Sequence, residues 1–405
     1  MSILARLSVS CLLVTSLTFA QSSDEEIQRR IEGLISLVRA ASFDQAIKDV
    51  NDLVNTNPGS FAAHMASFRV HFSAFQNQPG DAGGSDNLEE ALKRLDFARR
   101  LNPLDYEAWE LSLSFWSPSR VNQPPPGQET EQLLMEAGDF MEAGQAGQAA
   151  ENLKKVIALE PDYTPAYLHL GEIYLAQGDY PEALRLADTV SAKNPRDPDS
   201  FFLAARAYAL LERGQESLDS LIRSLRADPG FPPAWGMLTR LDLGGNHVEH
   251  MAVHFPKEVL WLVDREVDEP TLEDLEPLNA FARPAWKDYI SARVRWRKVT
   301  FQRQNPEFKV YRYTFREEIT AVTDMLGIWA EIKASQPEAK DPLLDHWLDA
   351  SRAGALEVAI FLDLYLEEFR QDFTGWKQEN GTKFEEYFHK YLLPKFSQPM
   401  IETAG

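Results

Sequence analysis

Three histidines with the spacing of a metal site occur in one short stretch of the chain. They are three of only eight histidines, namely His247, His250 and His254. On a helix this spacing places all three on one face, as zinc ligation requires. The order is not the metalloprotease motif, because no Glu directly follows the first histidine. The adjacent Gly244 and Gly245 weaken the case for a helix. We therefore interpret the three as unrelated surface histidines and expect no metal and no other cofactor.

A basic, aromatic segment between residues 287 and 316 could bind an anion. This segment carries a net positive charge, although the whole chain has a net charge of −21. Basic residues that alternate with aromatic rings can bind an anionic polymer, a phospholipid surface or an acidic protein. The alternative is that the segment docks on the acidic repeats of this same chain. The residues predicted to form the patch are Arg293, Arg295, Trp296, Arg297, Arg303 and Arg312.

Motifs of the common enzyme classes are absent from the sequence. There is no G-x-S-x-G elbow, no phosphate-binding glycine loop and no dinucleotide fingerprint. Carboxylates are so numerous that any pair chosen for acid–base catalysis would be arbitrary. We therefore predict a protein that is not an enzyme and assign no catalytic residues. The strong negative charge also argues against nucleic acid as a partner.

The elements that must position these residues are indicated by a period of 34 residues. Pro161, Pro195 and Pro229 are 34 residues apart, and each closes a stretch with the same alternation of large and small side chains. A fixed period of this size predicts stacked repeats. The alternation allows two helices to pack closely where the small residues lie. In the central stretch it is formed by Tyr167, Leu170, Gly171, Tyr174, Ala183, Ala187 and Val190.

This pattern resembles the tetratricopeptide repeat over about residues 24–245. The resemblance implies an all-α fold, in which helical hairpins stack into a superhelix with an extended concave surface. We expect degenerate repeats over 24–118, a Pro-rich linker over 119–129, repeats over 130–163, 164–197 and 198–231, and a partial repeat over 232–245. Residues 246–405 are expected to form a C-terminal helical domain that resembles no family known to us.

Four helices are predicted in the C-terminal region. Thr314 and Glu317 have the spacing of a capping box at the start of the second. For the first, a β-hairpin that includes residues 294–301 is an alternative, which we disfavour because the apolar residues also form a helical stripe. The predicted ranges are 285–302, 316–334, 343–369, which Gly354 could interrupt, and 383–393.

The resemblance also implies which residues would contact a ligand. In this family the ligand-facing side chains lie on the first helix of each repeat. The matching positions hold Leu134, Met141, Leu168, Glu172, Leu175, Phe202, Arg206, Leu210 and, in the partial repeat, Arg240. Apolar residues with one acid and two arginines suit an amphipathic segment of a partner protein or peptide. The alternative is that the apolar residues contact a neighbouring helix or the C-terminal domain.

The N-terminus predicts export. Residues 1–20 combine a basic Arg6, an apolar stretch and a small-x-small cleavage site, as in a secretory signal. Its removal would take the one cysteine, Cys11, and change the net charge from −21 to −22. No other stretch is long and apolar enough for a transmembrane span. We expect an adaptor of the bacterial periplasm, or a secreted one, that binds its partner in the repeat groove. The alternative is a cell-envelope enzyme or anionic-polymer-binding protein whose active part is the C-terminal domain.

Overall fold

A computed structural model describes residues 22–77, 82–116, 127–241, 247–306 and 311–393. The predicted signal segment and most of the predicted linker lie outside these ranges. All regular secondary structure within them is helical, which confirms the all-α prediction. No helix in this part of the chain is both long and apolar enough to cross a membrane. The chain divides into two compact units, Met1–Arg94 and Leu95–Gly405, which are described separately.

The first unit is built around an amphipathic helix. It contains α1 (Ser22–Arg39), α2 (Phe43–Thr56), α3 (Phe61–Asn77) and the first part of α4 (Ala82–Leu101). Helix α2 buries Ala46, Val50 and Leu53 on one face and packs on both α1 and α3. These residues recur at helical spacing, so one side of α2 is apolar and the other polar.

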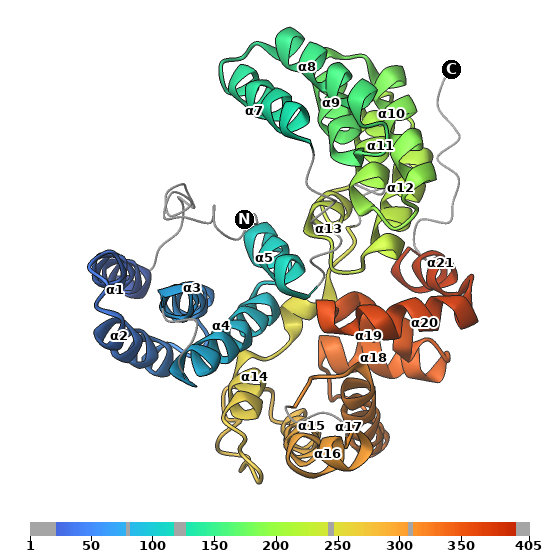
Figure 1. Cartoon of the computed structure of the whole chain (residues 1–405). Coiled ribbons are helices and arrows are strands. Elements are labelled where there is room, and N and C mark those ends of the chain that lie inside the picture. The colour runs from blue at the N-terminus through green and yellow to red at the C-terminus, as the bar shows by residue number, and fades with distance from the viewer. Residues whose placement is uncertain (1–21, 78–81, 117–126, 242–246, 307–310, 394–405) are drawn as a thin grey trace. The chain divides into compact units, whose positions relative to one another are not determined.

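The second unit contains three helical hairpins that stack in chain order (Figure 1). They pair α7 (Gln128–Glu142) with α8 (Ala146–Leu159), α9 (Thr164–Gln177) with α10 (Tyr180–Lys193), and α11 (Pro198–Leu210) with α12 (Gly214–Ala227). A Cβ atom on Gly171 would clash with Leu203 Cδ2, so a larger residue there would force the Leu203 side chain of α11 to move. Ser217 stands where the other repeats have alanine, and its hydroxyl donates to the Ala205 carbonyl at 2.8 Å. The polar substitution is therefore tolerated in the core.

Helix α7 begins this stack. Its apolar face, with Leu133, Ala137 and Phe140, packs on α8. Its sequence QETEQLLMEAGDFME also carries five carboxylates and no basic side chain, although Met135 and Met141 are exposed among them. A terminal helix of a repeat array needs such a polar outer face, because no further repeat covers it.

Helices of varied length make up the rest of the second unit. A helix α5 (Tyr106–Trp116) precedes the repeats. After them come α13 (Pro232–Leu238), the 3₁₀ turn η3 (Met251–His254), α14 (Lys257–Asp264), α15 (Arg283–Arg295), the π-helical turn η4 (Trp296–Thr300), α16 (Phe301–Gln304), α17 (Phe315–Ser335), α18 (Pro342–Arg352), α19 (Leu356–Asp363), the 3₁₀ turn η5 (Glu367–Phe369), α20 (Arg370–Asn380), α21 (Lys383–Tyr387) and the π-helical turn η6 (Phe388–Leu392). Residues 294–301 are thus helical and do not form the alternative hairpin. The Thr314 hydroxyl accepts from the Glu317 amide at 3.2 Å, as predicted, but the Glu317 carboxylate accepts from Arg293 and Tyr311 and does not complete the capping box.

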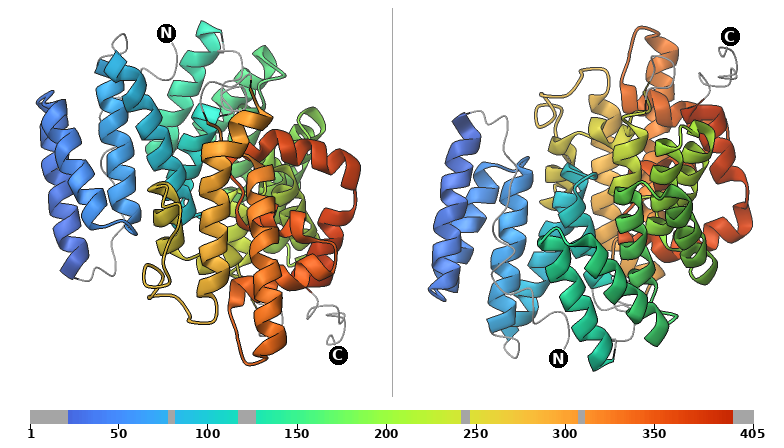
Figure 2. Two further views of the ribbon diagram at one scale, coloured as in Figure 1. Left: turned by 90° about the horizontal axis from the view of Figure 1, so that it is seen from below. Right: turned by 90° about the horizontal axis from the view of Figure 1, so that it is seen from above.

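One hydrophobic core joins the last repeats to the C-terminal helices. It includes Trp109 of α5, Leu225 of α12, Trp235 of α13, Trp286 of α15 and Trp347 of α18. The views in Figure 2 show the red helices α20 and α21 beside the last repeat helices, and Arg226 of α12 forms an ion pair with Glu385 of α21 at 2.8 Å. Burial of a large apolar side chain contributes roughly 1.5–3 kcal/mol, so this shared core holds the two parts of the second unit together.

Candidate protein-binding groove

The predicted groove residues lie on the first helices of the three hairpins. Leu134 and Met141 are on α7, Leu168, Glu172 and Leu175 on α9, and Phe202, Arg206 and Leu210 on α11. Equivalent positions lie side by side because each hairpin repeats the geometry of the one before it. Arg240 lies two residues beyond the end of α13 and is exposed.

An ion pair occupies the middle of this surface. Arg206 Nη1 donates to both carboxylate oxygens of Glu172, each at 2.6 Å. The two residues are 34 positions apart, so the pair links equivalent turns of α9 and α11. Both side chains are partly exposed, and such a pair contributes only about 0–1 kcal/mol to stability. Its main effect is to leave the centre of the surface without net charge.

Apolar side chains at other predicted groove positions are open to solvent. Met141 is 47 % exposed and Leu210 is 53 % exposed. Leu134 and Leu168 are half-buried. Large apolar side chains that remain exposed at these positions are available to a partner.

Two predicted groove residues contact the chain itself. Leu175 is only 5 % exposed and packs with Ala183 and Leu203, so its place in the groove is corrected to the core. Phe202 is half-buried and meets Phe231 edge to face, with ring centroids 5.8 Å apart. Phe231 in turn lies 5.1 Å from Trp109 of α5. The sequence left open whether the groove residues face a partner or contact this chain itself, and both occur. Some positions on α7 and α9 stay open to solvent, whereas the start of α11 is partly covered by Phe231.

Sequence reasoning missed the contribution of α5 to this covered end. Tyr106 of α5 is about half exposed, and partial desolvation of its hydroxyl together with the nearby charges of Glu110 and Asp199 raises its pKa to about 12. Asp199 belongs to the first turn of α11, so Tyr106 lies near the start of that helix. The aromatic residues of this segment were the available signal, but the pattern could not say which helix they would contact.

The basic segment does not form one surface. Arg293 is 1 % exposed, with Nε 2.6 Å from Glu317 Oε1 and Nη1 2.5 Å from Glu318 Oε2. Trp296 is also buried. Both are therefore corrected from a surface patch to the interior. Arg295, Arg303 and Arg312 are exposed.

The acids that the segment meets belong to its own C-terminal region. Arg297 lies 3.4 Å from Glu266 and stacks over the Tyr311 ring at 4.7 Å. Lys298 pairs with Asp268 at 2.8 Å. Between α15 and the segment with Asp268 and Glu269 lies an open hollow of about 730 Å³. Both signs of charge line it, with Asp268, Glu269, Asp288, Lys287, Arg295 and Lys298.

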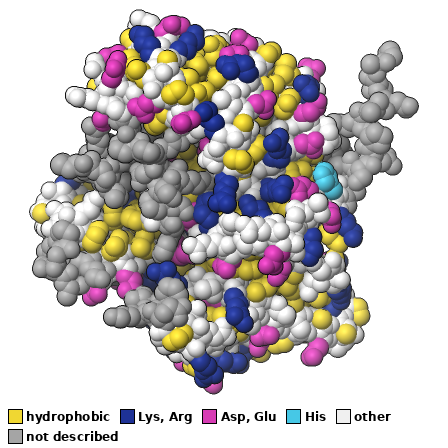
Figure 3. Space-filling model, turned by 45° about the vertical axis from the view of Figure 1, so that its right-hand side comes forward, with side chains coloured by type: hydrophobic (Ala, Val, Ile, Leu, Met, Phe, Trp, Pro, Cys, Tyr) yellow, Lys and Arg dark blue, Asp and Glu magenta, His cyan; other side chains and the backbone are white. Residues whose placement is uncertain are grey.

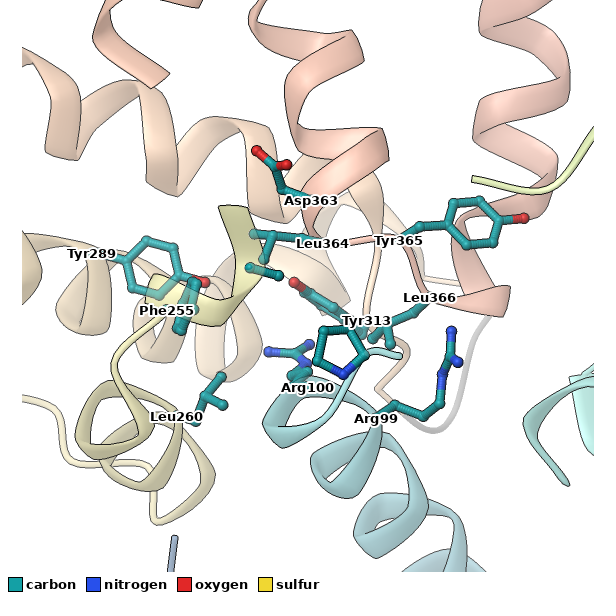
Figure 4. Close-up of a pocket in the computed structure, with 12 residues that line it drawn as sticks. Arg99, Arg100, Phe255, Leu260, Tyr289, Tyr313, Asp363, Leu364, Tyr365 and Leu366 are labelled. Atoms are coloured by element: carbon teal, nitrogen blue, oxygen red, sulfur yellow. The ribbon is translucent and has the colours of Figure 1, made fainter. Parts of the chain in front are cut away.

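Arg293 is part of a buried polar network beside a small cavity. The Tyr289 hydroxyl donates to Glu318 Oε1 at 2.6 Å, and Arg100 of α4 lies 4.2 Å from the centroid of the Tyr313 ring. Burial raises the pKa of both tyrosines well above the usual value. Figure 4 shows Arg100, Tyr289 and Tyr313 around the cavity. Its volume of about 20 Å³ has room for roughly one water molecule, so it is too small for a substrate.

The three histidines do not converge. His247 Nδ1 lies 3.1 Å from the Leu241 carbonyl, and His254 Nε2 lies 2.9 Å from Glu249. His250 is 4 % exposed and packs on the Trp235 ring, which corrects its prediction as a surface histidine. Across the ranges that the structure describes, no group of three or more His, Cys, Asp or Glu side chains could hold a metal ion.

Comparison with known proteins places the repeats in a family. Residues 140–207 match the family model described as tetratricopeptide repeat. Over 94 residues the chain is 31 % identical to the "TPR repeat-containing protein YpiA" of Bacillus subtilis (strain 168), a match that covers 23 % of this chain and 22 % of that protein. The chain thus aligns with about a fifth of this curated relative's length.

Two solved structures match the chain with low overall similarity. One is titled "Crystal structure of YrrB: a TPR protein with an unusual peptide-binding site". It is 15 % identical, with a TM-score of 0.26, and the match covers 54 % of this chain and 98 % of that one. The other is the PilF protein of Pseudomonas aeruginosa, also 15 % identical, with a TM-score of 0.25 and the same coverage. Because both TM-scores are low, these two superpositions do not bear on the family of this chain. The family assignment rests on the sequence match and on the helical hairpins.

Proposed function

This chain is a tetratricopeptide repeat protein, and on that premise we propose that it is a scaffold that holds a partner protein or peptide in the groove of α7, α9 and α11. Tetratricopeptide repeats are protein-interaction modules. The observation that carries the proposal is the exposure of Met141 on α7 and of Leu210 on α11, together with the neutral Glu172–Arg206 pair between α9 and α11. An amphipathic segment could cover these apolar side chains while its polar face stays in water.

The groove is tested by changing the exposed apolar residues alone. In the double variant Met141→Ser, Leu210→Ser we expect partner capture from the native source to fall at least tenfold, because the apolar area that the partner covers is lost. Folding should be unaffected, since neither side chain is in the core. Capture is measured by affinity purification followed by mass spectrometry.

Two other exposed apolar residues provide the matched control. Met135 is also on α7, and Leu159 ends α8, and neither is at a ligand-facing position of the repeat. The double variant Met135→Ser, Leu159→Ser should capture the same partner as the unmodified protein. Equal capture by both double variants would remove the groove from consideration.

We also propose that the protein is exported, in keeping with the signal-like residues 1–20. N-terminal sequencing of the protein from its native source should then begin near Gln21. A cytoplasmic protein that retains Met1 or its neighbours would exclude export. The groove proposal does not depend on this result, since partner capture tests it separately.

A further inference from the structure

Four basic side chains lie where the last full repeat meets α20. Arg226 is in the final turn of α12, Arg196 is in the turn between α10 and α11, and Arg370 and Lys377 are on α20. Lys377 Nζ donates to the Arg226 carbonyl oxygen at 2.8 Å and lies 4.3 Å from the centroid of the Phe373 ring. Figure 3 brings the side with α12, α20 and α21 forward and shows Lys and Arg side chains gathered in the middle of this face.

The ammonium group of Lys377 lies close enough to the three arginines for their charges to act on its pKa. Burial, together with the positive charges of Arg226, Arg196 and Arg370, lowers the pKa of this ammonium group to about 8, whereas Asp228 opposes the shift. Collecting like charges is unfavourable unless something compensates for them. The chain as a whole is strongly acidic, so this local concentration of positive charge stands out.

The acids around the four residues compensate only part of the charge. Arg226 pairs with Glu385 at 2.8 Å, and Arg370 pairs through Nε with Glu367. Asp228 already accepts from Trp109 Nε1 at 3.1 Å and from the Gly230 amide at 3.0 Å.

Donors remain available after these pairs are counted. Arg196 is exposed, and no ion pair to its guanidinium occurs among the described residues. Arg370 Nη2 is buried, and the described part of the chain offers it no hydrogen-bond partner. A buried guanidinium nitrogen without an acceptor is costly, but an anion from solvent can reach only the exposed part of the Arg370 side chain, which is 24 % accessible.

We propose that Arg196, Arg226, Arg370 and Lys377 form a binding site for a phosphate group, either free, on a small molecule or on a lipid headgroup. Phosphate suits the site because it carries about two negative charges and several acceptor oxygens. The planar guanidinium groups can each donate two parallel hydrogen bonds to it. This site lies on α12 and α20, outside the groove of α7, α9 and α11, and it does not depend on the function proposed for that groove.

Binding of phosphate has two measurable consequences. The ligand contacts residues of the repeats and of α20 together, so it should raise the melting temperature of the folded chain. The added negative charge should also raise the pKa of Lys377. At pH 8 binding is therefore accompanied by proton uptake, which isothermal titration calorimetry detects as a dependence of the binding enthalpy on the buffer.

The experiment uses the full mature chain and inorganic phosphate, with chloride at the same ionic strength as the reference. Phosphate should raise the melting temperature more than chloride does. Arg196→Gln should weaken phosphate binding roughly tenfold, since it removes a charged hydrogen-bond donor, and it should fold normally because the side chain is exposed. Arg303→Gln, at an exposed arginine on α16, is the matched control and should bind like the unmodified protein.

The variant Lys377→Arg tests whether phosphate binding needs only the positive charge at this position or also its loss and gain of a proton. This variant keeps the positive charge but does not titrate near pH 8, so it should bind phosphate without proton uptake. Vesicles of about 30 mol % phosphatidylglycerol in phosphatidylcholine distinguish the two sources of the phosphate group. Flotation of the protein with these vesicles assigns the site to a lipid headgroup. Binding of inorganic phosphate without flotation assigns it to a soluble phosphate. Equal responses to phosphate and chloride, or unchanged phosphate binding in Arg196→Gln, would overturn the proposal.

Discussion

The environment of His250 removes its charge at neutral pH. The ring is buried, its centroid lies 4.3 Å from that of Trp235, and Nδ1 accepts from the Ala252 amide at 3.3 Å. Burial lowers the pKa of His250 to about 4, with Asp363 acting against the shift and Arg99 adding to it. The sequence revealed the spacing of this histidine and its neighbours, but not that the segment turns only one of them inward.

Acid should destabilise the protein through this residue. In the unfolded chain His250 has a pKa of about 6.5, so as pH falls below that value the unfolded state takes up a proton that the folded state does not. The free energy of unfolding therefore decreases between about pH 6.5 and pH 4, by up to about 3 kcal/mol in total.

The His250→Asn variant provides the test by urea unfolding at a series of pH values. Asn keeps an acceptor for the Ala252 amide but does not titrate, so the loss of stability in this range should be smaller than in the unmodified protein. Parallel pH dependence in the two proteins would show that another group is responsible.

At the level of the elements, the helix from residue 283 to residue 304 shows what pattern can and cannot predict. The apolar stripe correctly predicted a helix. It did not predict the π-helical turn at Trp296–Thr300, because an offset of the hydrogen-bond ladder leaves no mark in the spacing of the apolar residues. It also did not predict that Arg293 lies inside, since arginine is rarely buried without a partner. The partners, Glu317 and Glu318, are on α17 and are brought close only by tertiary packing.

Loss of the Arg293 side chain should strongly destabilise the folded protein. The variant Arg293→Met leaves two buried carboxylates without their cation, so we expect a loss of about 3–5 kcal/mol in the free energy of unfolding. Arg303→Met removes an exposed arginine from the same helical stretch and should change stability by less than about 0.5 kcal/mol. Urea unfolding at pH 7 compares the two. A loss below about 1 kcal/mol for Arg293→Met would show that Glu317 and Glu318 find other partners or protons.

For the whole molecule, the sequence predicted the repeats far better than their surroundings. The prolines at 34-residue intervals and the small residues between them led to hairpins at 128–227 in the right places. They could not reveal that the C-terminal helices share a core with α12 and α13. Contacts between residues far apart in the chain have no local signal, and the period ends where these helices begin. The convergence of Arg196, Arg226, Arg370 and Lys377 was hidden for the same reason, because these residues come from separate segments.

The acidic surface of α7 determines how the repeat array can associate. Stacked hairpins present similar faces at each junction, so two chains can in principle join end to end and grow into a filament. Two copies that meet through α7 would bring ten carboxylates together, twice the five in its sequence, with no cation on that helix to offset them. Repulsion of this kind acts over roughly 8–10 Å at physiological salt and weakens as salt screens it. We therefore expect the carboxylates of α7 to disfavour end-to-end association of two chains through this helix, and to do so less strongly as the salt concentration rises.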